Sequence, residues 1–280
     1  MKLKELRTQI IDKLKSSESN SPETDASLIL MHVLGINKTQ LLLGDITISD
    51  EDVLKIQLMT DRCACGEPVQ YIIGKCEFMS LSFTVAPGVL IPRCDTEILV
   101  EEVIKRLNPN SPLVVADLGC GSGCIGISLA HYIKNISVLS VDISDIALKI
   151  ANKNADRNNV SDRIRFLKLD MTKQPLPHAV DCIVSNPPYI RSDVIETLAS
   201  NVRDHEPLSA LDGGSDGLVF YRKIAENSNL NPGGLLAFEI GYDQGKAVSD
   251  ILVKNGYINV EIIKDLENRD RVVLGFSQNN

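Results

Sequence analysis

From about residue 95 onward, short apolar runs alternate with segments that have helical periodicity. The apolar runs lie at 113–116, 138–141, 164–167, 180–184, 235–238, 258–263 and 272–274. Helix-like segments occur between them, at 125–132 and from Ser144 onward. Such alternation is typical of a mostly parallel sheet with helices on both faces, because each pair of parallel strands needs a crossover connection. The sequence therefore predicts an α/β domain of the Rossmann-like type at 95–280.

The first 70 residues have a different pattern. Apolar side chains recur there at the three- and four-residue spacing of an amphipathic helix, at Leu3, Leu6, Ile10, Ile11 and Leu14. Ser21 and Pro22 are typical of a helix start, Gly35 of a helix end, and Ser49 opens a segment that resembles a capping box. These signals predict a small helical domain at 1–70.

Residues 71–94 lie between these two parts. They contain short β-like runs at 71–74, 81–85 and 89–91, with Gly and Pro between them. This pattern predicts a connector that contains a β-hairpin.

Composition restricts the possible partners. The chain of 280 residues has a net charge of −8 and only 4% aromatic residues, which disfavours nucleic acid because phosphate binding needs basic surfaces and base stacking needs aromatic rings. No apolar stretch is long enough to span a membrane, and the charged N-terminus lacks a signal core, so we expect a cytoplasmic protein. Seven scattered cysteines and isolated histidines predict free thiols and no metal site.

A glycine-rich loop follows the first apolar run of the α/β part. Its sequence is Asp117-Leu118-Gly119-Cys120-Gly121-Ser122-Gly123, and Asp142 ends the next predicted strand. Glycines allow a ligand to lie against bare backbone, and a carboxylate at the end of the next strand can accept hydrogen bonds from both hydroxyls of a ribose. The loop and Asp142 together predict a site for a cofactor that contains a nucleoside.

Two cofactors fit this pattern. The spacing Gly121-x-Gly123-x-x-Gly126 matches the dinucleotide fingerprint of NAD proteins. The acidic Asp117 favours S-adenosylmethionine instead, since a carboxylate repels a pyrophosphate and attracts a sulfonium or an ammonium group. Asp170, after the third strand, is expected to accept from the adenine amino group, and Met171 to pack on the ring. The residues expected to bind the cofactor are Asp117, Gly119, Cys120, Gly121, Ser122, Gly123, Asp142, Asp170, Met171 and Asn186.

The tetrapeptide Asn186-Pro187-Pro188-Tyr189 follows the strand predicted at 180–184. Two prolines fix the backbone and remove two donors, which leaves rigid carbonyl acceptors. The Asn186 oxygen and the Pro187 carbonyl can accept both protons of an NH2 group, and Tyr189 can stack on the flat group that carries it. We expect Asn186, Pro187, Pro188 and Tyr189 to bind the substrate and to act in catalysis on a planar amino nitrogen.

The tetrapeptide and the glycine loop resemble those of class I amino-methyltransferases that modify adenine N6, cytosine N4 or glutamine N5. Further segments resemble the release-factor glutamine methyltransferases of the PrmC/HemK family, at 66–74, 78, 87–97, 206–214, 216–218, 238–241 and 265–271. The resemblance implies a seven-stranded class I methyltransferase sheet and methylation of the glutamine in the Gly-Gly-Gln motif of class I peptide-chain release factors. It also implies a monomeric cytoplasmic enzyme, S-adenosylhomocysteine as the product, and a helical domain that helps dock the release factor.

Two residues depart from the family pattern, Cys94 in place of a common Pro and Cys124 at a position that is usually small or apolar. Arg93 and Glu97 are either residues that line the site or members of structural ion pairs. The alternatives for function are an adenine-N6 methyltransferase of nucleic acid, a methyltransferase for another protein glutamine, an NAD enzyme and a nucleotide-binding module without catalysis.

Overall fold

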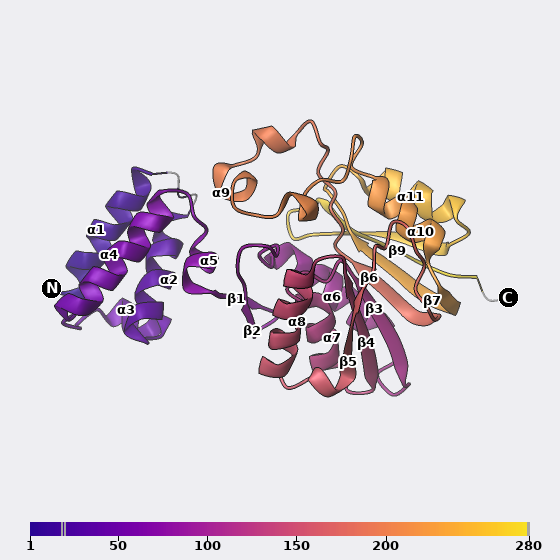
Figure 1. Cartoon of the computed structure of the whole chain (residues 1–280), viewed down its shortest axis with the longest axis horizontal. Coiled ribbons are helices and arrows are strands. Elements are labelled where there is room, and N and C mark those ends of the chain that lie inside the picture. The colour runs from indigo at the N-terminus through magenta and orange to yellow at the C-terminus, as the bar shows by residue number, and fades with distance from the viewer. Residues whose placement is uncertain (18, 20, 279–280) are drawn as a thin grey trace. The chain divides into compact units, whose positions relative to one another are not determined.

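The computed structural model describes residues 1–17, 19 and 21–278, shown in Figure 1. Apart from residues 18 and 20, these residues form two compact units: 1–75 with 197–206, and 76–196 with 207–278. Each unit has a hydrophobic core within it, one built on helices and the other on a sheet. In the described residues, no helix is long and apolar enough to span a membrane.

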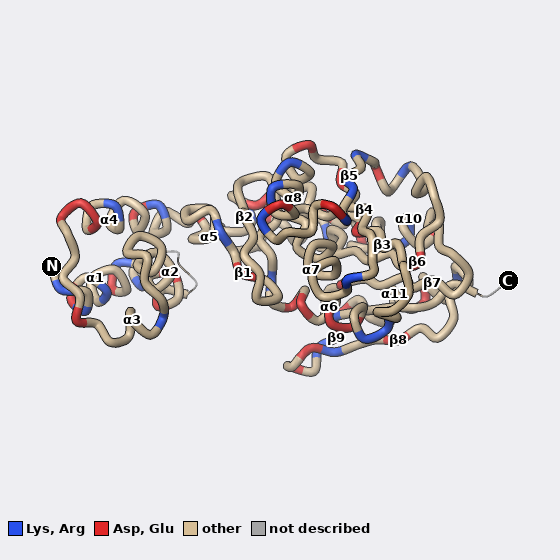
Figure 2. The backbone as a smooth tube through the Cα atoms, turned by 90° about the horizontal axis from the view of Figure 1, so that it is seen from below, with Lys and Arg blue, Asp and Glu red and all other residues tan. Residues whose placement is uncertain are grey.

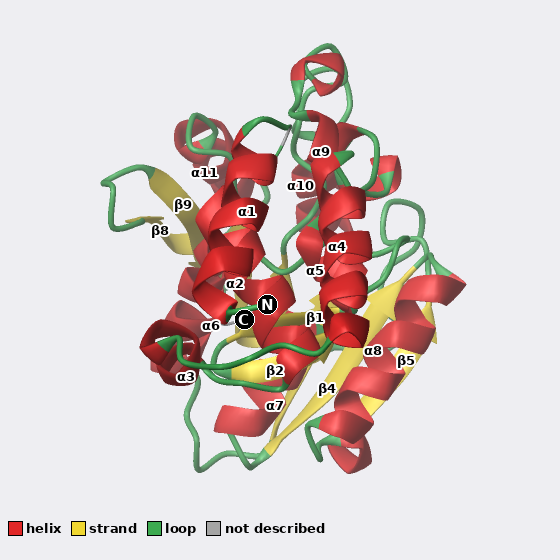
Figure 3. Cartoon of the chain, turned by 90° about the vertical axis from the view of Figure 1, so that its left-hand side faces the viewer, coloured by secondary structure: helices red, strands yellow, loops and turns green. Residues whose placement is uncertain are grey.

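The described residues of the N-terminal segment of the first unit form five helices. They are α1 (Leu3–Lys15), α2 (Pro22–Leu34), α3 (Lys38–Leu43), α4 (Asp50–Ala64) and α5 (Val69–Ile73). Helices α1, α2 and α4 pack against one another, as Figure 3 shows, and bury Leu6, Ile29 and Ile56. The predicted helix signals are confirmed: α2 begins at Pro22, Gly35 ends it with a φ of 64°, and the Ser49 hydroxyl caps α4.

The β-like pattern at 71–74 is a wrong prediction. These residues belong to α5 and to the Gly74 that ends it, because Val69 and Ile72 bury their side chains in the helical core. The hairpin comes directly afterwards, as β1 (Lys75–Phe78) and β2 (Leu81–Thr84), and 89–91 form no strand. Burial in the helical core therefore outweighed the β propensity of Ile72 and Ile73.

The second unit is built on a seven-stranded sheet with the order β5-β4-β3-β6-β7-β9-β8. All pairs are parallel except those that involve β9. Its strands are β3 (Leu113–Leu118), β4 (Ile136–Asp142), β5 (Ile164–Lys168), β6 (Val180–Ser185), β7 (Leu230–Glu239), β8 (Ile258–Lys264) and β9 (Asp270–Phe276). The predicted α/β fold with a mostly parallel seven-stranded sheet is confirmed.

Helices cover both faces of this sheet (Figure 1). On one face, α6 (Cys94–Arg106), α7 (Cys124–Tyr132) and α8 (Asp145–Arg157) pack around Val115 and Val184. On the other face, α10 (Val219–Asn227) and α11 (Gly245–Lys254) pack around Leu236 and Ile183. A short helix, α9 (Ser200–Arg203), and 3-10 turns at Ser161–Arg163, Ile195–Thr197 and Leu208–Ala210 complete the described elements.

Candidate active site

A cavity of about 530 Å³ opens at the carboxyl ends of β3, β4 and β6. Loops that follow parallel strands converge at this edge, and such edges are the usual ligand sites of open α/β sheets. Seven of the residues predicted for the site line the cavity: Gly119, Gly121, Asp142, Asp170, Met171, Asn186 and Pro188. The cavity volume lies within the range of small-molecule sites.

Other predicted residues lie behind the lining. Cys120 has its backbone N–H bonded to the Val141 carbonyl, and its side chain is buried. Ser122 is buried as well, and its carbonyl accepts from the Asn154 amide. Asp117, Gly123, Pro187 and Tyr189 also do not line the cavity. These residues shape the loops that carry the lining residues.

The glycine loop needs its glycines for two different reasons. Gly119, Gly121 and Gly123 all have positive φ, at 71°, 54° and 80°. At Gly123 a Cβ would lie 3.0 Å from Ala151 Cβ and 3.3 Å from Ala151 Cα, so a larger residue would push the loop away from α8. At Gly121 a Cβ would meet nothing within 4 Å, so this glycine presents open backbone to the cavity. Gly123 thus holds the loop in place, and Gly121 leaves space for a ligand.

Asp142 connects the loop to the end of β4. Its Oδ2 accepts from the Gly121 backbone N–H at 2.9 Å and its Oδ1 from the Ser144 N–H at 2.9 Å. Each carboxylate oxygen has more than one acceptor position, so both can still accept from a ribose hydroxyl. The backbone bonds hold the carboxylate in one orientation at the cavity wall.

Asp117 is fully buried at the end of β3. Its Oδ2 accepts from the Gly126 N–H at 2.9 Å, and its Oδ1 has no hydrogen-bond partner in the described part of the chain. Burial raises the pKa of this carboxyl to about 7, and the neighbouring Asp142 adds to the shift. Asp117 does not line the cavity, so it would act on a ligand only through its charge. In its ionised form that charge favours a cationic ligand such as S-adenosylmethionine over a pyrophosphate.

Asp170 and Met171 form the wall next to β5. Asp170 Oδ1 accepts from the Thr172 N–H and hydroxyl, Lys173 pairs with Oδ2, and these contacts lower the pKa of Asp170. Met171 lies with its Cε 3.2 Å from where a Gly119 Cβ would be. Met171 therefore packs directly against the glycine loop at Gly119, at the edge of the cavity where the adenine ring is predicted.

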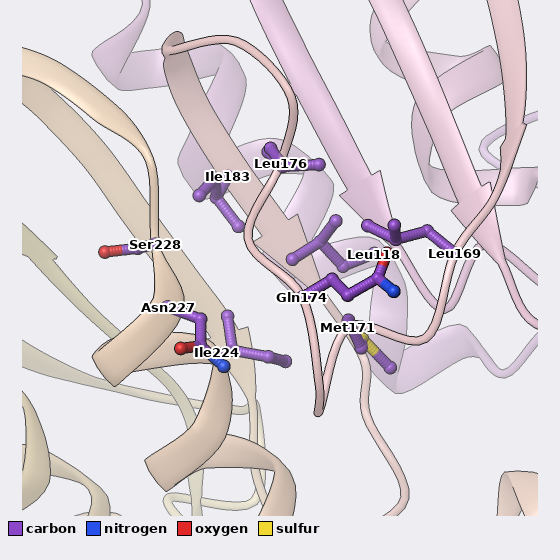
Figure 4. A pocket seen from close by; sticks show the side chains of 9 residues that line it. All are labelled: Leu118, Leu169, Met171, Gln174, Leu176, Ile183, Ile224, Asn227 and Ser228. Carbon is purple, nitrogen blue, oxygen red and sulfur yellow. The ribbon is translucent and has the colours of Figure 1, made fainter.

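A small second cavity of about 10 Å³ lies behind Met171, and Figure 4 shows its lining. Met171 and Leu169 line both cavities, whereas Ile183 and Ile224 close the small one on the side of the core. The thioether is flexible and has space behind it, so it can adjust to a ring placed against it.

The Asn186–Tyr189 loop is held from several directions. The Asn186 Nδ2 donates to the Thr96 hydroxyl at 3.2 Å. The Tyr189 carbonyl accepts from the Gln244 Nε2 at 3.0 Å, and the same amide donates to the Gly217 carbonyl. Both prolines are buried. The loop is therefore a fixed wall of the cavity.

Two glycines pack directly against this loop. A Cβ on Gly213 would lie 2.7 Å from Tyr189 Cα, and one on Gly217 would lie 2.5 Å from the Tyr189 carbonyl oxygen. Hydrogen bonds between Ile190 and the 211–213 segment hold the two stretches together. No side chain fits at either glycine, so the tetrapeptide depends on residues far from it in sequence.

The Tyr189 ring is half-buried, and burial raises the pKa of its phenol well above the usual range. It is neutral at physiological pH. It packs against the apolar cluster beneath α10.

Several lining residues were missed by the motif analysis: Val89, Leu90, Ile143, Ala147, Leu169, Pro207, Leu208, Ala210 and Phe220. Five of them lie in segments that resemble the family: Val89 and Leu90 in 87–97, and Pro207, Leu208 and Ala210 in 206–214. Glu97, left open by the sequence, accepts from the Met79 N–H at 2.6 Å and so fixes the turn between β1 and β2.

The strand order, the single antiparallel strand β9, the glycine loop after β3 and the acidic end of β4 define a class I S-adenosylmethionine-dependent methyltransferase. A methyltransferase from Pyrococcus furiosus shares the fold, with a TM-score of 0.52 and 20% identity over 72% of this chain and 91% of that one. The family model "Methyltransferase small domain" matches residues 94–231 and "PrmC N-terminal domain" matches 5–74.

Relatives extend the match to nearly the whole chain. The release factor glutamine methyltransferase of Clostridium botulinum is 42% identical over 98% of both chains. That of Moorella thermoacetica is 39% identical over 99% of both. The chain therefore belongs to the release factor glutamine methyltransferase family.

Proposed function

We propose that this protein methylates the N5 side-chain amide of the glutamine in the Gly-Gly-Gln motif of class I peptide-chain release factors. S-adenosylmethionine supplies the methyl group and leaves as S-adenosylhomocysteine. The observation that carries the proposal is full-length similarity to glutamine methyltransferases in a chain whose Asn186 and Pro188 line the cofactor cavity.

The residues around the cavity suit a poor nucleophile. An amide nitrogen delocalises its lone pair, so it attacks only when it is held in line with the methyl group. Asn186 Oδ1 and the Pro187 carbonyl can accept both amide protons, and they stabilise the positive charge that develops on nitrogen. No strong base is needed, because the methylated nitrogen is very acidic until it loses a proton.

The cofactor half of the site is assigned to the residues predicted for it. Asp142 would hold the ribose, Met171 and Asp170 the adenine, and Gly119 and Gly121 the backbone face of the cofactor. Asp117 sets the negative potential beneath the loop, and Cys120, Ser122 and Gly123 support its shape. These assignments rest on the cavity lining and on the hydrogen bonds of Asp142.

The partner is proposed to be a protein, bound by a monomer in the cytoplasm, with the helical unit taking part in docking. Figure 2 shows basic and acidic residues interspersed along α4, where Lys55 pairs with Glu51. Mixed charges of this kind and a net charge of −8 favour a protein partner over nucleic acid.

The test uses labelled S-adenosylmethionine, the purified protein and a class I release factor. A matched release factor with alanine in place of the glutamine of Gly-Gly-Gln serves as the control, and a DNA duplex as a second acceptor. Label on the unmodified factor alone supports the proposal. Label on DNA would instead favour adenine-N6 methylation, and equal labelling of both release factors would favour another protein glutamine.

A further inference from the structure

Beneath the Asn186–Tyr189 loop lies a buried carboxylate that the proposed reaction has not used. Glu239 ends β7, and its side chain is 2% exposed. Its Oε2 has no hydrogen-bond partner within the described residues. An ionisable group in such a place is costly to bury, so a role at the neighbouring site is the natural reason for it.

The sheet places Glu239 beside Asn186. In the parallel pair of β6 and β7, Ser185 lies opposite Phe238, so the next residue of each strand continues in register. Side chains in register point to the same face of a sheet. Asn186 and Glu239 therefore project side by side toward the same helix, α6, which contributes Thr96 from its first turn.

Thr96 is a hydrogen-bond partner of Asn186 and interacts with Glu239. Its hydroxyl is buried and accepts from Asn186 Nδ2 at 3.2 Å. Burial is the strongest effect on Glu239 and raises its pKa to about 7. Hydrogen bonds from Thr96 and from Asn186 act in the opposite direction and lower that pKa. A hydroxyl that accepts from an amide still has its own proton to donate, and the carboxylate is the acceptor next to it.

The order of donors decides which way the Asn186 amide faces. With Glu239 ionised, the carboxylate can only accept, from the Thr96 hydroxyl and from Asn186 Nδ2. Thr96 also accepts from Asn186 Nδ2, and this arrangement leaves Asn186 Oδ1 for the cavity. With a proton on Glu239, the carboxyl can donate to Thr96, and Thr96 can then donate to Asn186 Oδ1. The second arrangement would turn an NH2 group toward the substrate and remove the acceptor that the reaction needs.

We propose that Glu239, acting through Thr96 and directly on the Asn186 amide, is the positioning residue that keeps Asn186 Oδ1 directed at the substrate nitrogen. The part of this inference that concerns the substrate rests on the proposed function. The orientation of Asn186 itself is a property of this chain alone, and it can be measured without any substrate.

Other charged and titratable groups surround Glu239. Arg271 on β9 lowers the pKa of Glu239, and Asp95 on α6 raises it. Arg271 forms an ion pair with Asp95 at 3.0 Å and a second one with Asp265. The charge of Glu239 also raises the pKa of Tyr189, which follows β6. Burial raises the pKa of Cys124 on α7 and of Tyr221 on α10 beyond the usual range, and the charge of Glu239 adds to both shifts.

The first test is a titration by NMR of the full chain with labelled asparagine side chains. The Asn186 NH2 signal is assigned by its loss in Asn186→Asp. We expect this signal to titrate with a midpoint near the pKa of Glu239, about 7, and to stop titrating in Glu239→Gln. A signal that does not move in the wild type, or that still moves in Glu239→Gln, would overturn the proposal.

The second test is kinetic and compares Thr96→Val with Thr96→Ser. Loss of the hydroxyl should lower kcat by about 10- to 100-fold, because the reacting nitrogen loses a correctly placed acceptor. Thr96→Ser should restore most of the rate, and the Kd for S-adenosylmethionine should stay within about twofold in both. Thr60→Val, a loss of a buried hydroxyl in the helical unit, is the matched control.

The two tests separate this inference from the proposed function. Equal loss of kcat in Thr96→Ser and Thr96→Val, or a loss confined to cofactor binding, would contradict the positioning role. If the wild type does not methylate release factors at all, the proposed function fails, and the Asn186 titration still decides whether Glu239 orients the amide.

Discussion

The two halves of the cavity are held together in different ways. The cofactor half is made largely of backbone: Gly119, Gly121 and the Asp142 carboxylate that binds the Gly121 N–H come from adjacent segments of β3 and β4. The amide half is held by side chains from distant segments, such as Gln244 on the Tyr189 carbonyl and Thr96 on Asn186. Changes in the first half should therefore affect cofactor binding, and changes in the second should affect the rate of transfer.

The two halves also differ in whether nearby or distant residues hold their loops in place. A turn rich in glycine is set mainly by its own φ preferences and by one carboxylate. The Asn186–Tyr189 loop needs α6, α11 and the 211–213 segment to be in place before its acceptors point into the cavity. The amide half is thus the part of the site that folds only with the complete domain.

The largest expected effect is on the amide half, from Asn186→Ala. Removing this acceptor should lower kcat by about 1,000-fold, a loss similar to that of a preorganised group at an oxyanion site. Cofactor affinity, measured by calorimetry, should fall far less than kcat, because Asn186 is one of ten residues expected to bind the cofactor. A parallel loss of cofactor affinity would contradict the separation of the two halves.

Asp142→Ala is the corresponding change in the cofactor half. The loss of charge-assisted hydrogen bonds to a ribose should weaken S-adenosylmethionine binding by about 30-fold. At saturating cofactor the rate should recover most of its value. Calorimetric titration together with kcat at high cofactor concentration checks this, and an unchanged Kd would remove Asp142 from the ribose site.

Gly213→Ala tests whether packing against Tyr189 holds the amide half. A Cβ 2.7 Å from Tyr189 Cα forces the backbones apart, which should cost about 1–2 kcal/mol of stability and lower kcat. The matched control is Gly35→Ala, where a Cβ meets nothing within 4 Å and the cost is backbone strain alone. Equal kcat values for the two variants would show that this contact does not shape the loop.

The smallest effect expected is the pH dependence of stability that comes from Asp117. Because burial raises the pKa of Asp117 to about 7, its contribution to stability is complete at low pH and is lost as pH rises through 7. We compare the Tm of the unfolding transition that moves when S-adenosylmethionine is added. Between about pH 6 and about pH 7.5 this Tm should fall by less in Asp117→Asn than in the wild type. Identical slopes in the two proteins would mean that the pKa of Asp117 does not differ between the folded and the unfolded state.

Much of the cofactor half could be predicted from the sequence. The glycine loop, Asp142 and Asp170 follow apolar runs whose ends meet at one edge of a parallel sheet, so their proximity follows from the order of elements. Gly119, Gly121, Asp142, Asp170 and Met171 do line one cavity. The same reasoning was wrong at 71–74, where β-branched residues joined a helix because the helical core could bury them.

The sequence by itself determined the α/β class, the helical N-terminal part and the residue types at the two motifs, because periodicity and turn chemistry are local. Only the tertiary structure decided which residues support Asn186 and Tyr189. Thr96, Glu239, Gln244 and Gly213 lie far from the tetrapeptide along the chain. The first, second and fourth lie in segments that resemble the family, but no local pattern gives any of the four its contact with the tetrapeptide loop. Their roles arise from strand register and close packing, which exist only after the sheet and its helices have assembled.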